Sequence, residues 1–152
     1  MTRRSEEGLV SGLEALAFGV LILVVGTLVV VNAWAVIDAR FATSAAAREA
    51  VRAVVEAPDI GLDGPQLEAR ARSAAAQALV AHGYEHEPEL TGPPLTQARC
   101  ATVEVTVELE VVATILPWVS QPPSYRVASS HSEVVDPFRA GLGGEGIDGC
   151  GF

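Results

Sequence analysis

The side chains best suited to covalent chemistry are Cys100 and Cys150, the only cysteines in the chain. An even cysteine count in a domain outside the cytoplasm indicates a disulfide. The bond would close a loop of about 50 residues and would stabilise the fold by an amount on the order of 4 kcal/mol in the chain-entropy model. It would also join the Gly-rich C-terminal end to the start of the main predicted strand. Two unpaired thiols are the alternative.

Histidines and carboxylates are the next candidates for chemistry. His82 and His86 have the spacing of metal ligands on a helix, but Gly83 lies between them where the helix should end, and no third ligand accompanies them. Ser130 and His131 are adjacent, yet no third group completes a nucleophile–base arrangement. The alternating acidic residues are most simply the solvated face of a strand: Glu104, Glu108 and Glu110. We therefore predict no metal, no cofactor and no enzymatic activity.

The distribution of charge excludes further classes of function. The chain has a formal net charge of −9 and no lysine. Its first 37 residues hold two arginines and three glutamates, and the remainder holds eight arginines and 16 acidic residues, so the net charges are −1 and −8. A domain without a basic patch cannot release counterions from phosphates, which argues against nucleic acid. Neither nucleic acid nor a small-molecule substrate is expected as a partner.

One long apolar run determines where the rest of the chain is held. Residues 15–37 contain no charged side chain and are mostly Val, Leu, Ala, Ile, Phe and Gly. As a helix they would span about 35 Å, enough to cross a hydrocarbon core of roughly 30 Å with some tilt. A cleaved secretory signal has a shorter apolar core followed by a small-residue cleavage site, whereas this run continues into Asn32, Ala33 and Trp34. The run therefore predicts a retained transmembrane helix.

The orientation of this helix is inferred from what flanks it. The N-terminal tail is short, and the sequence that can fold lies after the helix. Trp34 stands at the C-terminal end of the run, where interfacial aromatic residues gather. Arginines flank both ends, so the positive-inside count is nearly even. We predict a single-pass protein of the cell membrane, with the N-terminus inside and the C-terminal domain outside.

The helical pattern continues beyond the apolar run until Pro58. Small apolar residues recur there on one side at helical spacing: Ala47, Ala50, Val51, Val54 and Val55. A second helix begins at Asp63, which has the capping-box spacing to Gln66, and it ends near Gly83. It carries a stripe suited to close packing against the first helix: Leu67, Ala71, Ala74, Ala78 and Ala81.

Strands are predicted in the C-terminal half. Residues 103–115 alternate between apolar and polar side chains, which is typical of a strand with one buried face. Residues 125–135 have a weaker pattern and are expected to return antiparallel, and a short edge strand is expected within residues 84–99. The predicted class is α+β, with a long N-terminal transmembrane and stalk helix and a second helix packed on a small antiparallel sheet.

The predicted organisation has five parts. In chain order they are a short cytoplasmic N-terminus (1–14), a transmembrane helix (15–37), an extracytoplasmic stalk helix (38–57), a small α+β domain (58–139) and a Gly-rich tail (140–152).

Three features of the chain are candidates for contacts with partners. Gly8 and Gly12 form a small-xxx-small pattern that lets membrane helices approach closely. Glu14 interrupts the apolar stretch and either reaches water at the interface or pairs with a cationic group of a neighbouring subunit. The apolar turn at Leu116, Pro117 and Trp118 is either tucked into the core or offered to a partner or the lipid surface.

Several of these segments together resemble the TadE/TadG-like proteins, the pilin-like minor subunits of the tight-adherence pilus system. The basic start at Arg3 and Arg4 and the residues Gly8 and Glu14 precede the apolar helix. Residues 45–53 read Ala-Ala-Ala-Arg-Glu-Ala-Val-Arg-Ala, which is similar to an Ala-rich stretch of that family. The alternation over residues 103–109 and the later Leu-Pro turn are similar as well.

The resemblance implies a structural or assembly role in a pilus. It also implies cleavage by a prepilin peptidase between Gly8 and Leu9, although Glu14 lies one residue further on than in the usual pilin pattern. Glu14 would then pair with the new amino terminus of a neighbouring subunit. The implied partners are membrane lipid and other pilin-like or pilus-assembly subunits. A membrane-anchored extracytoplasmic binding module unrelated to pili, using the acidic strand face or the Trp118 turn, is the alternative.

Overall fold

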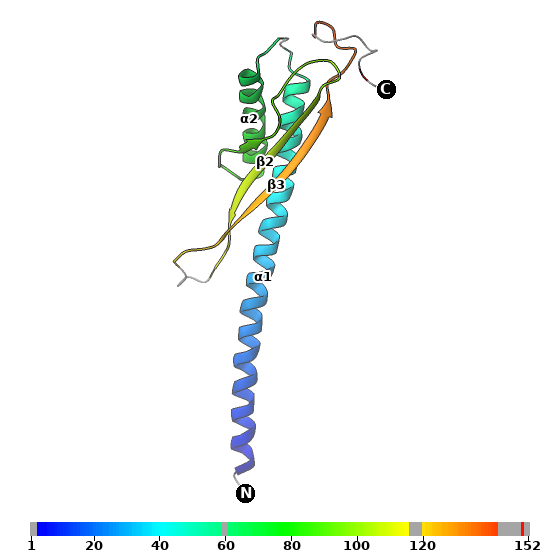
Figure 1. Ribbon diagram of the computed structural model, residues 1–152. Helices are drawn as coiled ribbons and strands as arrows, with labels where there is room; N and C mark the ends of the chain where they lie inside the picture. The colour runs from blue at the N-terminus through cyan, green and yellow to red at the C-terminus, as the bar shows by residue number, and fades with distance from the viewer. Residues whose placement is uncertain (1–2, 59–60, 116–119, 143–149, 151–152) are drawn as a thin grey trace.

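The computed structural model describes residues 3–58, 61–115, 120–142 and 150, with the side chains of residues 3–13 left undescribed. Two helices precede three strands: α1 (Arg3–Val55), α2 (Gly64–Ala81), β1 (Glu89–Thr91), β2 (Thr102–Val112) and β3 (Ser124–Val134). The strands form one antiparallel sheet in the order β1-β2-β3. Figure 1 shows the sheet and α2 gathered around the C-terminal half of α1, whose N-terminal half projects alone. The predicted α+β class is confirmed.

Helix α1 is 53 residues long, so it begins before the apolar run and continues through the predicted stalk without a break. It ends before Pro58, where the missing N–H and the ring exclude further helix. The last carbonyl groups of a helix lack partners within it. Here the Arg139 guanidinium donates to the carbonyl oxygens of Val55 and Ala57, and the Gln97 side-chain amide donates to that of Val54 at 3.3 Å. Residues from the C-terminal half of the chain therefore cap α1.

The predicted capping box begins α2. The Gln66 backbone N–H donates to Oδ1 of Asp63 at 2.9 Å, and the Asp63 N–H donates to Oε1 of Gln66 at 3.1 Å. Gly83 follows the helix with φ of 85°, a conformation that costs glycine little because it has no Cβ. The expected stripe was partly wrong: the buried residues are Leu67, Ala71, Ala75 and Leu79. Side chains four apart form a ridge inclined to the helix axis, which packs α2 obliquely on its neighbour.

Strand β2 has the predicted alternation, because its odd-numbered residues from Val103 to Val111 are buried and most of its even-numbered residues face solvent. It pairs with β3 over its whole length, from Thr102 opposite Val134 to Val112 opposite Ser124. Strand β1 pairs with the other edge of β2 over three residues. The sheet therefore has one apolar face, which lies against α1.

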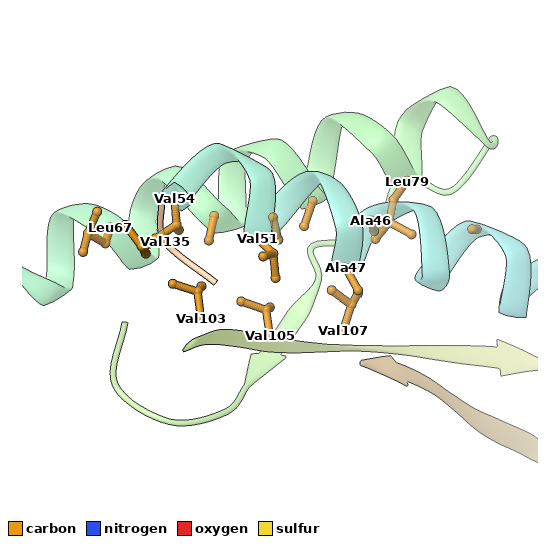
Figure 2. Close-up of a cluster of buried hydrophobic side chains, with 14 of the residues drawn as sticks. Ala46, Ala47, Val51, Val54, Leu67, Leu79, Val103, Val105, Val107 and Val135 are labelled. Atoms are coloured by element: carbon orange, nitrogen blue, oxygen red, sulfur yellow. The ribbon is translucent and has the colours of Figure 1, made fainter. Parts of the chain in front are cut away.

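The core lies on both sides of the C-terminal half of α1, and Figure 2 shows that helix between α2 and β2. Ala46, Ala50 and Val51 are fully buried there. Small side chains let the axis of α2 and the sheet approach α1 closely, whereas the valines of β2 fill the remaining space. Leu142 belongs to the same cluster, so the chain remains in contact with the core beyond β3.

Cys100 and Cys150 form a disulfide, with their Cα atoms 5.4 Å apart. The bond spans 50 residues. It holds residue 150 beside the segment that leads into β2. The backbone N–H of Cys100 also donates to the Val135 carbonyl at 3.2 Å, which fixes the same corner of the domain.

Candidate membrane anchor and packing surface

The apolar part of α1 from Glu14 to Val31 is largely uncovered by the rest of the protein. Its most apolar 18-residue window has none of its residues buried. Leu16, Phe18 and Leu23 are each about two-thirds exposed. A continuous apolar surface of this size is unstable in water and indicates contact with lipid or with other apolar helices. Within the described part of the chain, Glu14–Val55 is the one helical stretch long and apolar enough to cross a membrane.

The contact between α1 and the sheet begins at Asn32. The Asn32 side-chain amide donates from Nδ2 to the Thr114 carbonyl at 2.9 Å, and its Oδ1 accepts from the Thr114 N–H at 2.9 Å. Nδ2 also donates to the Leu28 carbonyl at 2.8 Å. One turn later, Ala35 and Val36 pack on a small cluster that includes Leu109. The chain just after β2 is therefore attached to the helix inside the segment predicted to span the membrane.

A row of large apolar side chains runs along the outer side of α1. Val30, Trp34, Ile37 and Phe41 are exposed by 65%, 71%, 48% and 67%, and their spacing of three and four residues places them on one face. The row passes Asp38, the first charged residue after the apolar run. Sequence reasoning identified Trp34 but missed Phe41, which continues the same helical spacing. This face suits packing against a neighbouring helix or the interfacial layer of a membrane.

A polar contact lies just beyond this row. The Tyr84 hydroxyl donates to Oδ2 of Asp38 at 2.9 Å and so links the loop after α2 to α1. Burial of the Tyr84 phenol, followed by its hydrogen bond to Asp38 and the charge of that carboxylate, raises the pKa of Tyr84 to about 12. Deeper in the interface, the Thr43 and Ser129 hydroxyls are 2.9 Å apart, which joins α1 to β3.

The predicted partner-contact residues have different placements. Gly8, Leu9 and Gly12 lie in the first turns of α1, before the apolar segment. Glu14 follows on the same helix and is exposed. The turn at Leu116, Pro117 and Trp118 lies outside the described residues. Peptidase cleavage after Gly8 and the pairing of Glu14 stay predictions.

The solvent-facing side of the sheet is acidic. Its carboxylates come from two adjacent strands: Glu89 on β1, and Glu104, Glu108 and Glu110 on β2. Arg126 of β3 lies 3.6 Å from the Glu108 carboxylate, and Glu89 is directly opposite Glu108 in the strand register. Over the described ranges, no three His, Cys, Asp or Glu side chains form a group that could hold a metal ion. His82 caps α2 through its backbone N–H, and its neighbour Gly83 ends the helix.

The fold and the uncovered helix define an α+β protein whose long N-terminal helix is a candidate membrane anchor or signal segment. A disulfide such as Cys100–Cys150 is typical of domains that fold in oxidising compartments. No protein-family model matches this chain, and no curated protein or solved structure matches it with significance.

Proposed function

We propose that this is a single-pass, pilin-like membrane protein that serves as a structural or assembly component of a tight-adherence-type pilus. One observation supports this proposal above the others. A single helix has an N-terminal half that projects free of the domain and a C-terminal half that is the centre of its core. Such a helix transmits movement of the membrane segment directly to the displayed domain, because no linker separates the two.

The uncovered half of α1 acts in lateral packing. Within lipid, helices associate through close packing and interhelical hydrogen bonds, since the lipid tails are as apolar as the side chains. Glycines at positions 8 and 12 and the row from Val30 to Phe41 supply surfaces for this contact. Glu14 supplies a carboxylate that pairs with a cationic group of the neighbouring subunit. Without such a partner, an ionised carboxylate in lipid would cost several kcal/mol.

The domain lies outside the cytoplasm in this proposal, and the N-terminus lies inside. Disulfides persist in oxidising compartments and are rare in the cytosol, so the Cys100–Cys150 bond favours this orientation. Because the membrane helix precedes the domain, the segment before it is left on the cytoplasmic side.

The proposal is tested by the intact mass of the protein purified from native membranes without reducing agent. A mass corresponding to residues 9–152 with one disulfide is expected, as produced by a prepilin peptidase. Gly8→Leu should abolish the processing, whereas Gly12→Leu is the matched control and should be processed normally. A full-length mass for the unaltered chain would overturn peptidase processing and remove the role of Glu14 toward a cut amino terminus.

Membership of an assembly needs a second measurement. A photo-crosslinker introduced at Phe41, on the exposed row, should capture other membrane proteins of the pilus system in cells. One at Arg40, which is exposed and lies about 100° from Phe41 around the helix, serves as the comparison. Crosslinks to lipid alone at Phe41 would contradict the packing role.

The acidic sheet face favours a second candidate, a membrane-anchored binding module. A groove of about 390 Å³ adjoins this face, between the start of α2 and β1, and Glu68 and Glu104 contribute to its lining. A cationic segment of a partner fits such a surface. Replacing residues 1–31 with an unrelated membrane helix separates the two candidates, because a binding module keeps its function and a packing subunit loses it.

A further inference from the structure

We propose that residues 111–115 and 120–125, where β2 and β3 end beside Thr114, are a second membrane-contact site, which lies in the interfacial layer of the bilayer beside the anchor. The inference rests on the proposed function only in requiring that α1 spans the membrane. It places the domain directly on the lipid surface. The predicted stalk, in contrast, would have held the domain above that surface.

The first support is the depth fixed by Asn32. Both polar groups of its side chain are bonded to the Thr114 peptide, so the end of β2 cannot move along α1 without breaking two hydrogen bonds. Asn32 follows Glu14 by 18 residues, which is a rise of about 27 Å along the helix. A hydrocarbon core is roughly 30 Å thick. With Glu14 at the inner interface, Asn32 and Thr114 therefore lie at the outer one.

The second support is the chemistry of the hairpin end. Residues 111–125 contain no charged side chain, although the chain as a whole is strongly acidic. The Val112 side chain is 60% exposed and the Tyr125 side chain is 45% exposed. The first charged residues beyond this segment are Glu110 on β2 and Arg126 on β3. They lie opposite each other, next to the pair formed by Val111 and Tyr125. An exposed aromatic and an exposed aliphatic side chain in a segment that itself carries no charge suit the interface of a bilayer.

The third support is the backbone. Peptide groups that enter lipid must find partners within the protein, because water does not accompany them. The Thr114 N–H and carbonyl are satisfied by Asn32, and the Ala113 N–H donates to the Pro123 carbonyl at 2.9 Å. Pro122 and Pro123 have no N–H to satisfy. Figure 1 shows the end of β2 and the start of β3 near the middle of α1, while the opposite end of β3 lies near the C-terminal end of the helix.

The experiment places an environment-sensitive fluorophore on one added cysteine of the full-length protein in lipid nanodiscs, with the Cys100–Cys150 disulfide kept oxidised so that it does not react. Ser124→Cys tests the hairpin end, and Ser132→Cys is the matched control on the same strand, about 26 Å further along it. Val25→Cys reports insertion of the anchor itself. Each sample is measured with ordinary lipids, with lipids brominated near the headgroup end of their acyl chains, and with lipids brominated near the terminal methyl end. Bromine near the headgroup reports on positions 124 and 132, and bromine near the chain end reports on position 25, which lies near the bilayer centre.

The expected result is loss of most of the emission at positions 25 and 124 in brominated lipid, with little change at position 132. Quenching at position 25 without quenching at 124 would overturn the hairpin site and leave the anchor intact. An emission at 124 that is blue-shifted but insensitive to bromine would mean that another protein copy covers the site, which also overturns it. Absence of quenching at position 25 would overturn the anchor and the hairpin site together.

Discussion

The two halves of α1 form one continuous helix and have opposite environments. Before Asn32 the apolar residues are large, such as Leu16, Phe18 and Leu23, and all three are exposed. After Asn32 the positions that face the domain are alanine and valine, and Ala46 and Val51 are fully buried. The difference teaches that side-chain size helps to distinguish a helix face that packs on protein from one that is exposed to apolar surroundings. Small side chains allow backbones to approach, whereas large ones offer surface to lipid.

The largest expected effect comes from placing the same charge in each half. Val51→Arg buries an unpaired guanidinium in the core and should remove several kcal/mol from the free energy of unfolding, enough to unfold the domain. Val25→Arg should leave the domain folded and lower membrane insertion by about 2.5–3.5 kcal/mol. Thermal unfolding in detergent and alkaline extraction of membranes measure the two effects. Equal loss of domain stability in both variants would break the comparison.

Enlarging an alanine in each half gives the next effect. Ala46→Leu overfills the space between α1 and α2 and should destabilise the domain by about 1–3 kcal/mol. Ala17→Leu is the matched change in the uncovered half, where it meets no other element, and should leave the unfolding midpoint unchanged. Chemical denaturation of both variants in the same detergent is the measurement. A midpoint for Ala46→Leu equal to that of the unaltered protein would show that this interface is not closely packed.

Asn32 marks the boundary between the halves, so its replacement sharpens the comparison. Asn32→Leu leaves the Thr114 N–H and carbonyl without their partner and should destabilise the attachment of the hairpin by about 1–3 kcal/mol. Thr27→Val is the control, because the Thr27 hydroxyl donates only within the helix, to the Leu23 carbonyl at 2.8 Å. Hydrogen exchange at the Thr114 amide should rise in the first variant alone. Unchanged exchange there would contradict the role of Asn32.

The smallest effect is the dependence on pH at the Tyr84 contact with Asp38. Because the folded-state pKa is about 12, above the ordinary value of about 10, folding favours the neutral phenol. The stability from this contact is therefore fully present below pH 10 and is lost as pH rises through about 12. Tyr125→Phe isolates Tyr84 in an absorbance titration of tyrosinate, and Tyr84→Phe should unfold with a weaker dependence on alkaline pH. A Tyr84 midpoint near 10 would contradict this account.

The sequence was informative wherever a local pattern is repeated. The helix caps at Asp63 and Gly83, the end of α1 before Pro58 and the alternation of β2 follow from short-range chemistry, and the structure has all of them. The buried stripe on α2 was only partly predicted. The predicted residues repeat every 3.5 residues on average and the buried ones every four, and these two spacings differ little over two turns. Which row is buried depends on the angle at which α2 meets α1.

The candidate surface was predicted in outline. The uncovered apolar run and the position of Trp34 could be inferred from residue types alone. The attachment of Thr114 to Asn32 could not, because an asparagine in an apolar helix has no pattern that identifies its partner 82 residues away.

By itself, the sequence determined the secondary structure, the apolar anchor segment and the acidic character of the domain, because periodicity, capping and charge are local properties of the chain. Only the tertiary structure decided which side of α1 is covered, that Arg139 caps its end and that the hairpin is fixed at Asn32. These contacts join residues more than 80 positions apart, so they depend on how the helix and the sheet pack against each other.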